Sequence, residues 1–301
     1  MSIDGPVFAV VTPFDSFGRI DEGALIRNLD FLSRSGVRSI VVNGTTGEFS
    51  SLSSEERNRV VALCRSNYQG KIIAHISSCS YVDSNMMAES ASDNGADALL
   101  LLPPYYFDIK DRGGLVSYYK KSLDQVDLPA YIYNFPFYTK VSLCVDDVRQ
   151  IYRACENVVG LKDSGGDFQL SSKFNEISDD FDVFVGGDSV ALEVLRAGMK
   201  GSVTGAGNPF PEFLVRLNEA WAQGDEGAAI AAQNAFDVWN ELRSQFNGYE
   251  VSIVKEALAY RVPDFPMAVR SPLVPLEEPE RALLRENYSS IMDEVASLGR
   301  Q

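Results

Sequence analysis

Short apolar runs rich in β-branched residues alternate along the chain with longer stretches in which apolar residues recur at helical spacing. The first run covers residues 7–12, and Leu25, Leu29 and Leu32 then share one face of a helix predicted over residues 21–35. Seven further runs are predicted as strands, at residues 39–43, 71–77, 98–102, 130–134, 158–162, 182–185 and 202–204. The alternation predicts eight consecutive strand–helix units.

Local signals set some of the helix ends. Ser53 and Glu56 form a capping-box pattern at the start of a helix predicted over residues 53–67. Asn94 and Gly95 are typical of a helix end and close the helix predicted over residues 82–94. From Phe213 onward the chain is predicted as helix, broken at Gly224 and by a proline-containing stretch at residues 263–279.

Eight strand–helix units in about 220 residues are typical of an α/β protein with a (β/α)8 TIM barrel. The strands are mostly continuous apolar runs, as expected when both faces of a parallel sheet are buried. An open doubly wound sheet is the alternative, but no GxGxxG pattern follows the first strand. We therefore predict a barrel over residues 1–224 and a small C-terminal helical subdomain over residues 225–301.

Composition narrows the function classes. The 301-residue chain carries 42 acidic and 27 basic residues, for a net charge of −15, which argues against nucleic acids or anionic membranes as partners. Its longest apolar runs, about six or seven residues, are far shorter than the roughly 20 of a membrane span. The first residues lack a basic segment followed by an apolar one, so no signal peptide is predicted and a cytoplasmic location is expected.

Cysteine and histidine usage argues against a metal centre. The four cysteines include no CxxC pair and none lies near histidine in ligand spacing. The single histidine, His75, lies within the third predicted strand, where we interpret it as a hydrogen-bonded residue of the interior. One histidine also makes a Ser-His-Asp arrangement improbable, so other groups must carry any acid–base chemistry.

Two polar residues end neighbouring strands of the predicted barrel. Function in such barrels lies at the carboxyl ends of the strands. Lys162 ends the sixth strand, where burial would favour the neutral amine that attacks a carbonyl. Tyr133 ends the fifth strand, and its phenol is suited to moving protons during imine formation. Taken alone, Lys162 is equally compatible with a solvated lysine, whereas a lone tyrosine in a strand, such as Tyr133, is far more often a packing residue.

Two loops complete the candidate chemistry. Gly44-Thr45-Thr46-Gly47-Glu48 follows the second strand, and its glycines permit a tight turn whose amides and hydroxyls suit a small carboxylate. Pro103-Pro104-Tyr105-Tyr106 follows the fourth strand, with tyrosines that can reach a site or pack on a second subunit. A plain turn and ordinary packing are the simpler interpretations of the two loops.

The ordered set of motifs resembles one family. GTTGE, PPYY, YNxP around Tyr133 and GLKDS around Lys162 follow strands two, four, five and six in that order. With VTPF at residues 11–14, GGD at residues 186–188 and RSPL at residues 270–273, they extend over nearly the whole chain. The sequence thus resembles the dihydrodipicolinate synthase/N-acetylneuraminate lyase superfamily of pyruvate-dependent class I aldolases.

The resemblance implies roles for the catalytic residues. Lys162 matches the Schiff-base lysine, Tyr133 the tyrosine that relays protons to and from the substrate, and Thr45 the threonine that continues this relay. Tyr106 matches a tyrosine contributed to the relay across a tight dimer interface, within a homotetramer built as a dimer of dimers. No metal or organic cofactor is implied, because the substrate imine at Lys162 is itself the electron sink.

The resemblance also implies substrate contacts. Thr46 and the loop amides match the site for the pyruvate carboxylate, and Gly187 and Val203 match backbone contacts to the keto acid. In dihydrodipicolinate synthases an arginine two residues after the YNxP proline binds the carboxylate of the aldehyde substrate. Tyr138 occupies that position here and cannot make a bidentate charged pair. Lys140 is a candidate replacement.

We therefore expect a carbon–carbon lyase that cleaves or forms a 2-oxo-3-deoxy sugar acid, with pyruvate and an aldehyde as the other reactants. A keto-sugar-acid dehydratase on the same Schiff base is the nearest alternative. A 4-hydroxy-tetrahydrodipicolinate synthase is disfavoured by Tyr138. The alternative from another class is a barrel that binds a keto acid without catalysis.

Overall fold

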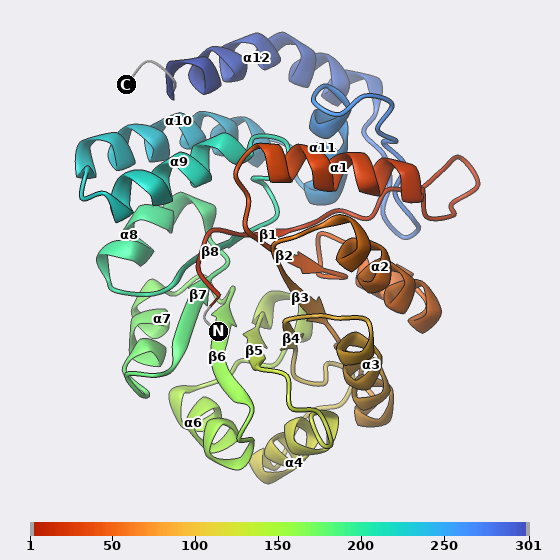
Figure 1. The fold of residues 1–301 in the computed structure, drawn as a ribbon, viewed down its shortest axis with the longest axis vertical. Coiled ribbons are helices and arrows are strands. Elements are labelled where there is room, and N and C mark those ends of the chain that lie inside the picture. Colours follow the sequence, from red (N-terminus) through yellow and green to blue (C-terminus); the bar gives the residue numbers. More distant parts are fainter. Residues whose placement is uncertain (1–2, 299–301) are drawn as a thin grey trace.

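The computed structural model describes residues 3–298, and residues 1, 2 and 299–301, the outer ends of the two predicted units, lie outside the described residues. Eight parallel strands close into a barrel in the chain order β1 to β8, with β8 paired to β1 (Figure 1). The predicted (β/α)8 barrel is confirmed. The strands are β1 (Val7–Ala9), β2 (Ser39–Val42), β3 (Lys71–His75), β4 (Ala98–Leu101), β5 (Ala130–Asn134), β6 (Val158–Asp163), β7 (Asp182–Val185) and β8 (Gly201–Thr204).

Helices surround the barrel and continue past its last strand (Figure 1). Those following the strands are α1 (Glu22–Arg34), α2 (Ser54–Asn67), α3 (Tyr81–Asp93), α4 (Arg112–Ser122), α5 (Pro136–Thr139), α6 (Val145–Ala154), α7 (Phe168–Asn175), α8 (Ala191–Arg196) and α9 (Pro211–Ala222). The C-terminal helices are α10 (Glu226–Ser244), α11 (Glu250–Ala259) and α12 (Glu278–Ser297). Short 3-10 turns η1 (Phe49–Ser51) and η2 (Asp188–Val190) follow the loops after β2 and β7.

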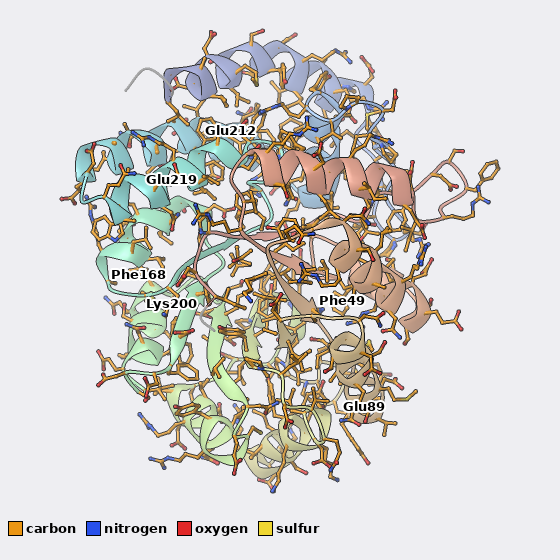
Figure 2. All side chains as sticks on the ribbon, in the orientation of Figure 1. Phe49, Glu89, Phe168, Lys200, Glu212 and Glu219 are labelled. Carbon is orange, nitrogen blue, oxygen red and sulfur yellow. The ribbon has the colours of Figure 1, made fainter. Side chains whose placement is uncertain are left out.

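The strands separate two hydrophobic cores because successive side chains point to opposite faces. In β5, Tyr131 and Tyr133 join the cluster inside the barrel, whereas Ala130 and Ile132 join the cluster between the sheet and the helices. Figure 2 shows side chains crowding the interior, while charged residues such as Glu89 project from the outer helices. The alternation places every second residue of a strand end in the barrel mouth.

Some predicted boundaries are wrong. The strand predicted over residues 7–12 ends at Ala9. The Val10 amide still donates to the Val41 carbonyl at 2.9 Å, and the Thr12 Oγ1 then donates to the Gly47 carbonyl at 2.8 Å. The C-terminal helices break at Gly248 (φ +82°) as well as at Gly224 (φ +76°). The capping box of Ser53 and Glu56 is confirmed at the start of α2.

The C-terminal helices contact the barrel through specific bonds. Trp239 of α10 is fully buried, and its indole N–H donates to the Ala206 carbonyl after β8 at 2.8 Å. Gln233 of the same helix accepts from the Leu192 amide at 3.1 Å and donates to the Asp188 carbonyl at 3.2 Å. Helix α10 therefore supports the loop that follows β7. Within the described residues, none of the helices is long and apolar enough to cross a membrane.

Candidate active site

Lys162 and Tyr133 lie side by side in the barrel mouth. They are register partners on the paired strands β6 and β5, and their side chains are 8% and 2% exposed. The Lys162 Nζ lies 4.2 Å from the centroid of the Tyr133 ring, so the amine meets the face of the phenol. An ammonium is attracted to such a ring face, and the contact holds the amine in place. The structure thus brings together the two residues that the sequence singled out at strand ends.

The residues that directly follow Tyr133 and Lys162, Asn134 and Asp163, form hydrogen bonds that hold the ends of the two strands together. Asn134 and Asp163 are also register partners, and the Asn134 amide donates to the Asp163 carboxylate at 2.8 Å. Asp163 also accepts from the Ser171 hydroxyl at 2.5 Å and from the Gly165 amide at 2.9 Å. These bonds fix the ends of β5 and β6 to each other and to α7. Sequence reasoning missed both residues, although each follows directly after a predicted catalytic one.

Glycine makes room beneath the lysine. A methyl group on Gly160, two residues before Lys162, would lie 2.8 Å from the Tyr131 ring and 2.2 Å from the Asp182 carbonyl. A side chain at this position would displace Tyr131 or separate β6 from β7. At this level of the interior, the Tyr131 ring occupies the space that a side chain on Gly160 would need. The Lys162 side chain lies above this packed layer.

The loop with Thr45 and Thr46 forms a tight turn at the end of β2. The Glu48 amide donates to the Thr45 carbonyl at 3.0 Å, and Glu48 has left-handed backbone geometry (φ 57°). Both threonines are half-buried. A methyl group on Gly205, just after β8, would lie 2.3 Å from the Thr46 Oγ1. The Thr46 hydroxyl therefore lies against the β8 end, on the side where Val203 lines the interior with 5% exposure.

A series of aromatic contacts extends from this loop to Tyr133, the ring that lies against Lys162. The Phe49 ring meets His75 edge-on at 4.4 Å between centroids, and His75 meets Tyr133 at 6.0 Å. His75 is 1% exposed, and its Nε2 lies 2.8 Å from the Ser77 hydroxyl oxygen. The interpretation of His75 as a hydrogen-bonded interior residue is therefore confirmed. Burial, together with the charges of Arg57 and Lys162, holds the pKa of His75 well below its usual range, so the ring is neutral.

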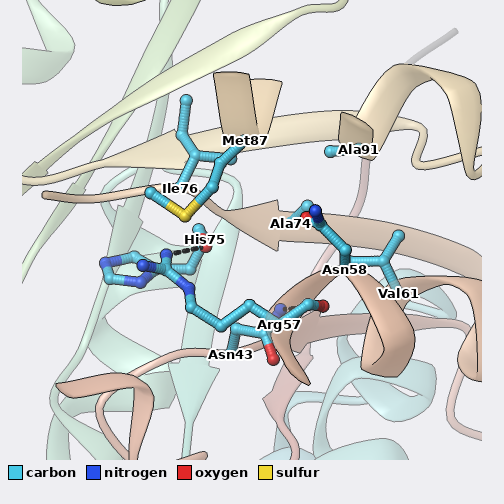
Figure 3. A pocket seen from close by; sticks show the side chains of 9 residues that line it. All are labelled: Asn43, Arg57, Asn58, Val61, Ala74, His75, Ile76, Met87 and Ala91. Atoms are coloured by element: carbon cyan, nitrogen blue, oxygen red, sulfur yellow. Dashed lines mark hydrogen bonds between the residues drawn. The ribbon is translucent and has the colours of Figure 1, made fainter. Parts of the chain in front are cut away.

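Arg57 supports this wall of the site from behind. Figure 3 shows it extending from α2 beside His75, in a small cavity between α2, β3 and α3. Its guanidinium donates to the backbone carbonyls of His75 and Ser77 at 2.5 and 3.0 Å, and burial lowers the pKa of Arg57 to about 10. Its own carbonyl accepts from the Asn43 amide at 2.9 Å. Nothing in the local pattern marks Arg57 as buried, and sequence reasoning missed it.

Asp188 contributes a second charged group to the mouth. It follows Gly187 after β7, and its Oδ1 is buried with no hydrogen-bond partner within residues 3–298. Burial raises the pKa of Asp188, while a hydrogen bond from Thr204 and the charges of Arg243 and Lys162 act in the opposite direction. The carboxylate is therefore within electrostatic reach of the lysine and has an unused acceptor. The sequence placed Asp188 in a motif without giving it a role.

An aromatic chain leads outward from the lysine on the other side. Phe135 stacks on Tyr133 with 5.6 Å between centroids, and Tyr138 of α5 meets Phe135 edge-on at 4.7 Å. The Tyr138 hydroxyl donates to the Glu250 carboxylate at 3.3 Å. Burial and the Glu250 charge raise the pKa of Tyr138 to about 12, which keeps the phenol neutral. Lys140 bends back, and its Nζ donates to the Phe137 carbonyl at 2.7 Å.

Tyr106 lies apart from this cluster. Its side chain is 80% exposed and its ring packs edge-on against Phe107, itself 75% exposed, at 5.3 Å. Tyr105 beside it is 39% exposed. The loop after β4 therefore presents three large aromatic side chains to solvent in the single chain, a surface of the kind that marks an interaction site.

Comparison with known proteins agrees with this architecture. The model of the Dihydrodipicolinate synthetase family matches residues 2–290. The 4-hydroxy-tetrahydrodipicolinate synthase of Bacillus subtilis (strain 168) is 32% identical over 287 residues, which cover 94% of this chain and 97% of that one. The structure of the 4-hydroxy-tetrahydrodipicolinate synthase from Methylacidiphilum fumariolicum SolV superposes with a TM-score of 0.88 and 28% identity, covering 99% of each chain.

A relative named for a different reaction has the same fold. The 2-keto 3-deoxygluconate aldolase from Picrophilus torridus superposes with a TM-score of 0.82 and 26% identity, covering 92% of this chain and 99% of that one. The full-length match of the family model, the close agreement of the folds and the identity to the Bacillus subtilis enzyme lead to one conclusion. The chain belongs to the dihydrodipicolinate synthetase family.

Proposed function

We propose that this protein is a class I aldolase that forms a Schiff base through Lys162 and cleaves a 2-oxo-3-deoxy sugar acid to pyruvate and an aldehyde. The observation that carries the proposal is the buried Lys162 amine at the carboxyl end of β6, held against Tyr133. A desolvated amine in a barrel mouth is suited to attack on a carbonyl, and a neighbouring phenol to proton transfer.

The reaction begins when the Lys162 nitrogen attacks the C2 carbonyl of the substrate. The carbinolamine loses water to give a protonated imine. Tyr133 then takes the proton of the C4 hydroxyl as the C3–C4 bond breaks, and the electron pair of that bond moves toward the imine nitrogen. The aldehyde leaves, and the remaining enamine is protonated at C3 and hydrolysed to pyruvate, which restores the amine. Because the imine accepts the electrons, the proposal needs no metal or organic cofactor.

The other predicted residues fit this scheme. Thr45 is proposed to continue the proton relay from Tyr133, and Thr46 to bind the pyruvate carboxylate with the amides of its turn. Gly187 and Val203 are proposed to contact the keto acid through their backbones. Thr46 lies against Gly205 and Val203 lines the interior, which supports a carboxylate site between the ends of β2 and β8.

Two residues favour a hydroxylated substrate. Asp188 offers a buried carboxylate oxygen that has no hydrogen-bond partner among the described residues, and hydroxyl groups are the neutral donors that satisfy such an acceptor. Tyr138 presents a neutral phenol where an aldehyde carrying a carboxylate would need a cation. The relation to the Picrophilus torridus 2-keto 3-deoxygluconate aldolase supports the same substrate class.

The synthase reaction is the second candidate. The Bacillus subtilis relative and several others at about 31% identity are named 4-hydroxy-tetrahydrodipicolinate synthase. Two assays separate the candidates: release of pyruvate from a 2-oxo-3-deoxy acid, and condensation of pyruvate with aspartate semialdehyde. A dehydratase would consume the sugar acid without releasing pyruvate, and a non-catalytic binding protein would be inactive in every assay.

Covalent trapping tests the central step. The protein is incubated with pyruvate and borohydride, and the modified residue is mapped by mass spectrometry. We expect one reduced pyruvate at Lys162 and none in Lys162→Ala. Lys140→Ala, which removes an exposed lysine at the same end of the barrel, is the matched control and should trap pyruvate normally. Absence of an adduct at Lys162 would rule out the mechanism.

The exposed tyrosines support a proposal on assembly. We expect a second subunit to cover Tyr105 and Tyr106 and to receive Tyr106 into its proton relay, within a homotetramer. Sedimentation of the protein and of Tyr106→Asp tests this expectation. The charge should dissociate the assembly and lower aldolase activity together, whereas an active variant with unchanged assembly would contradict it.

A further inference from the structure

A fully buried ion pair joins the C-terminal helices to the loop that carries Thr45 and Thr46. The Lys255 Nζ of α11 lies 2.5 Å from the Glu48 Oε1, and both side chains are 0% exposed. The two residues are 207 positions apart in the sequence. In Figure 1 the blue segment that contains α11 lies beside α1 and continues down toward α2.

The pair is almost completely hydrogen-bonded. Glu48 accepts from Lys255 through one oxygen and from the Arg270 backbone amide, at 2.9 Å, through the other. Lys255 donates a second bond to the Ala268 carbonyl at 2.8 Å. Its Nζ also lies 4.4 Å from the centroid of the Phe14 ring, and the Arg270 guanidinium lies at the same distance from that ring. A buried pair is tolerated only when its remaining donors and acceptors are satisfied in this way.

Arg270 extends the anchor to both sides of the loop. Its guanidinium donates to the Gly18 and Ser51 carbonyls, each at 2.7 Å, and to the Glu56 carboxylate. Glu56 in turn accepts from the Ser53 amide and so caps α2. Residues 48–56, which run from the turn into α2, are therefore held by one segment near the C-terminus.

The anchor acts directly on the turn. Glu48 closes it by donating its amide to the Thr45 carbonyl, and it does so in left-handed backbone geometry, which is unfavourable for a residue with a side chain. Fixing the Glu48 carboxylate in two directions stabilises that geometry. An apolar pair in the same place would fill the space at lower desolvation cost but would not fix direction. The charged pair therefore fills the space and also fixes the direction of the Glu48 carboxylate.

We propose that Lys255 is a positioning residue, which holds the turn at Thr45 and Thr46 in the geometry that receives the carboxylate of pyruvate through its pair with Glu48. This inference rests on the proposed function, because it assigns the turn to the pyruvate carboxylate. Burial lowers the pKa of Lys255 to about 8, although the charge of Glu48 and its hydrogen bond act in the opposite direction. Removing the Lys255 cation from water therefore carries a free-energy cost.

The test measures how borohydride trapping at Lys162 depends on pyruvate concentration. Lys255→Met keeps most of the length of the side chain and leaves Glu48 buried without its cationic partner. Glu48→Leu with Lys255→Met replaces the pair by apolar groups, so its thermal stability should recover toward the wild-type value. We expect both variants to need about 10- to 100-fold more pyruvate for half-maximal trapping, with a smaller change in trapping at saturation.

The double variant separates positioning from stability. If it is stable and binds pyruvate like the wild type, the pair is structural and the inference is overturned. Glu48→Gln, which keeps the shape and one oxygen acceptor, should fold and show an intermediate effect. Should Lys255→Met fail to fold, the other two variants carry the measurement.

A matched control uses another ion pair between a helix of the barrel and the C-terminal segment. Arg261 pairs with Glu212 of α9 and packs over Phe210 at 5.5 Å, as Lys255 packs over Phe14. Arg261→Met should lower stability and leave the pyruvate dependence unchanged. An adduct in the wild type with no change in the Lys255 variants overturns the inference alone. No adduct in the wild type overturns the proposed function and this inference with it.

Discussion

The Lys162 amine lies over the face of the Tyr133 ring, 4.2 Å from its centroid, on the neighbouring strand of the barrel. The ring therefore has two separable tasks. Its face packs against the amine, whereas only its hydroxyl can move a proton. Because phenylalanine keeps the face and removes the hydroxyl, one substitution divides the two tasks.

Tyr133→Phe should fold, and its free energy of unfolding should lie within about 1 kcal/mol of the wild-type value, because that is the usual net contribution of one hydrogen bond. Imine formation should slow by roughly 10²- to 10⁴-fold, the usual range for loss of a general acid–base group. The rate of borohydride-trapped adduct formation at saturating pyruvate measures this. An unchanged rate would assign Tyr133 to packing only.

Asp188→Asn should weaken the sugar-acid half of the reaction and spare the pyruvate half. A hydrogen bond to a charged acceptor is worth about 1.5–3 kcal/mol, so kcat/KM for a 2-oxo-3-deoxy acid should fall by roughly 10- to 100-fold. The pyruvate concentration for half-maximal trapping at Lys162 should not change. Equal losses in both measurements would instead indicate that Asp188 acts on the lysine.

Tyr138→Arg combined with Glu250→Gln should move specificity toward an aldehyde that carries a carboxylate. The second change is needed because Glu250, which now accepts from the Tyr138 hydroxyl at 3.3 Å, would otherwise pair with the new guanidinium. We expect condensation of pyruvate with aspartate semialdehyde to increase and cleavage of the sugar acid to decrease. Glu250→Gln alone is the control and should not gain the condensation activity.

His75 should make the protein less stable in mild acid. Its pKa is lowered in the folded state, so below about pH 6.5 the unfolded chain binds a proton that the folded chain does not. The free energy of unfolding should therefore fall as the pH drops through this range, by up to about 1.4 kcal/mol per pH unit from this residue.

The measurement is urea unfolding at several pH values between 7 and 5, with His75→Gln as the comparison. The variant should lose the part of the pH dependence that begins near pH 6.5, while keeping any part due to carboxylates at lower pH. Parallel curves for the two proteins would show that His75 takes up its proton equally in both states.

The sequence by itself determined the architecture and the central pair of the site. Short apolar runs, helical stripes and the capping box of Ser53 and Glu56 each report geometry within a few residues, and eight such units leave little choice of fold. Because parallel strands end at one edge, Lys162 and Tyr133 on successive strands had to meet there. The order and spacing of the motifs also indicate the family.

Only the tertiary structure decided what surrounds that pair. The partners of Glu48 come from α11 and from Arg270, more than 200 residues away, and Arg57 of α2 is buried beneath His75 although its helix shows no sign of it. The Asp188 Oδ1 has no hydrogen-bond partner in the described part of the chain, and Tyr138 bonds to Glu250; both facts likewise depend on how distant elements pack. Local patterns encode which face of an element is apolar, but which distant side chains meet is set by the packing of the whole chain, and no short stretch of sequence contains it.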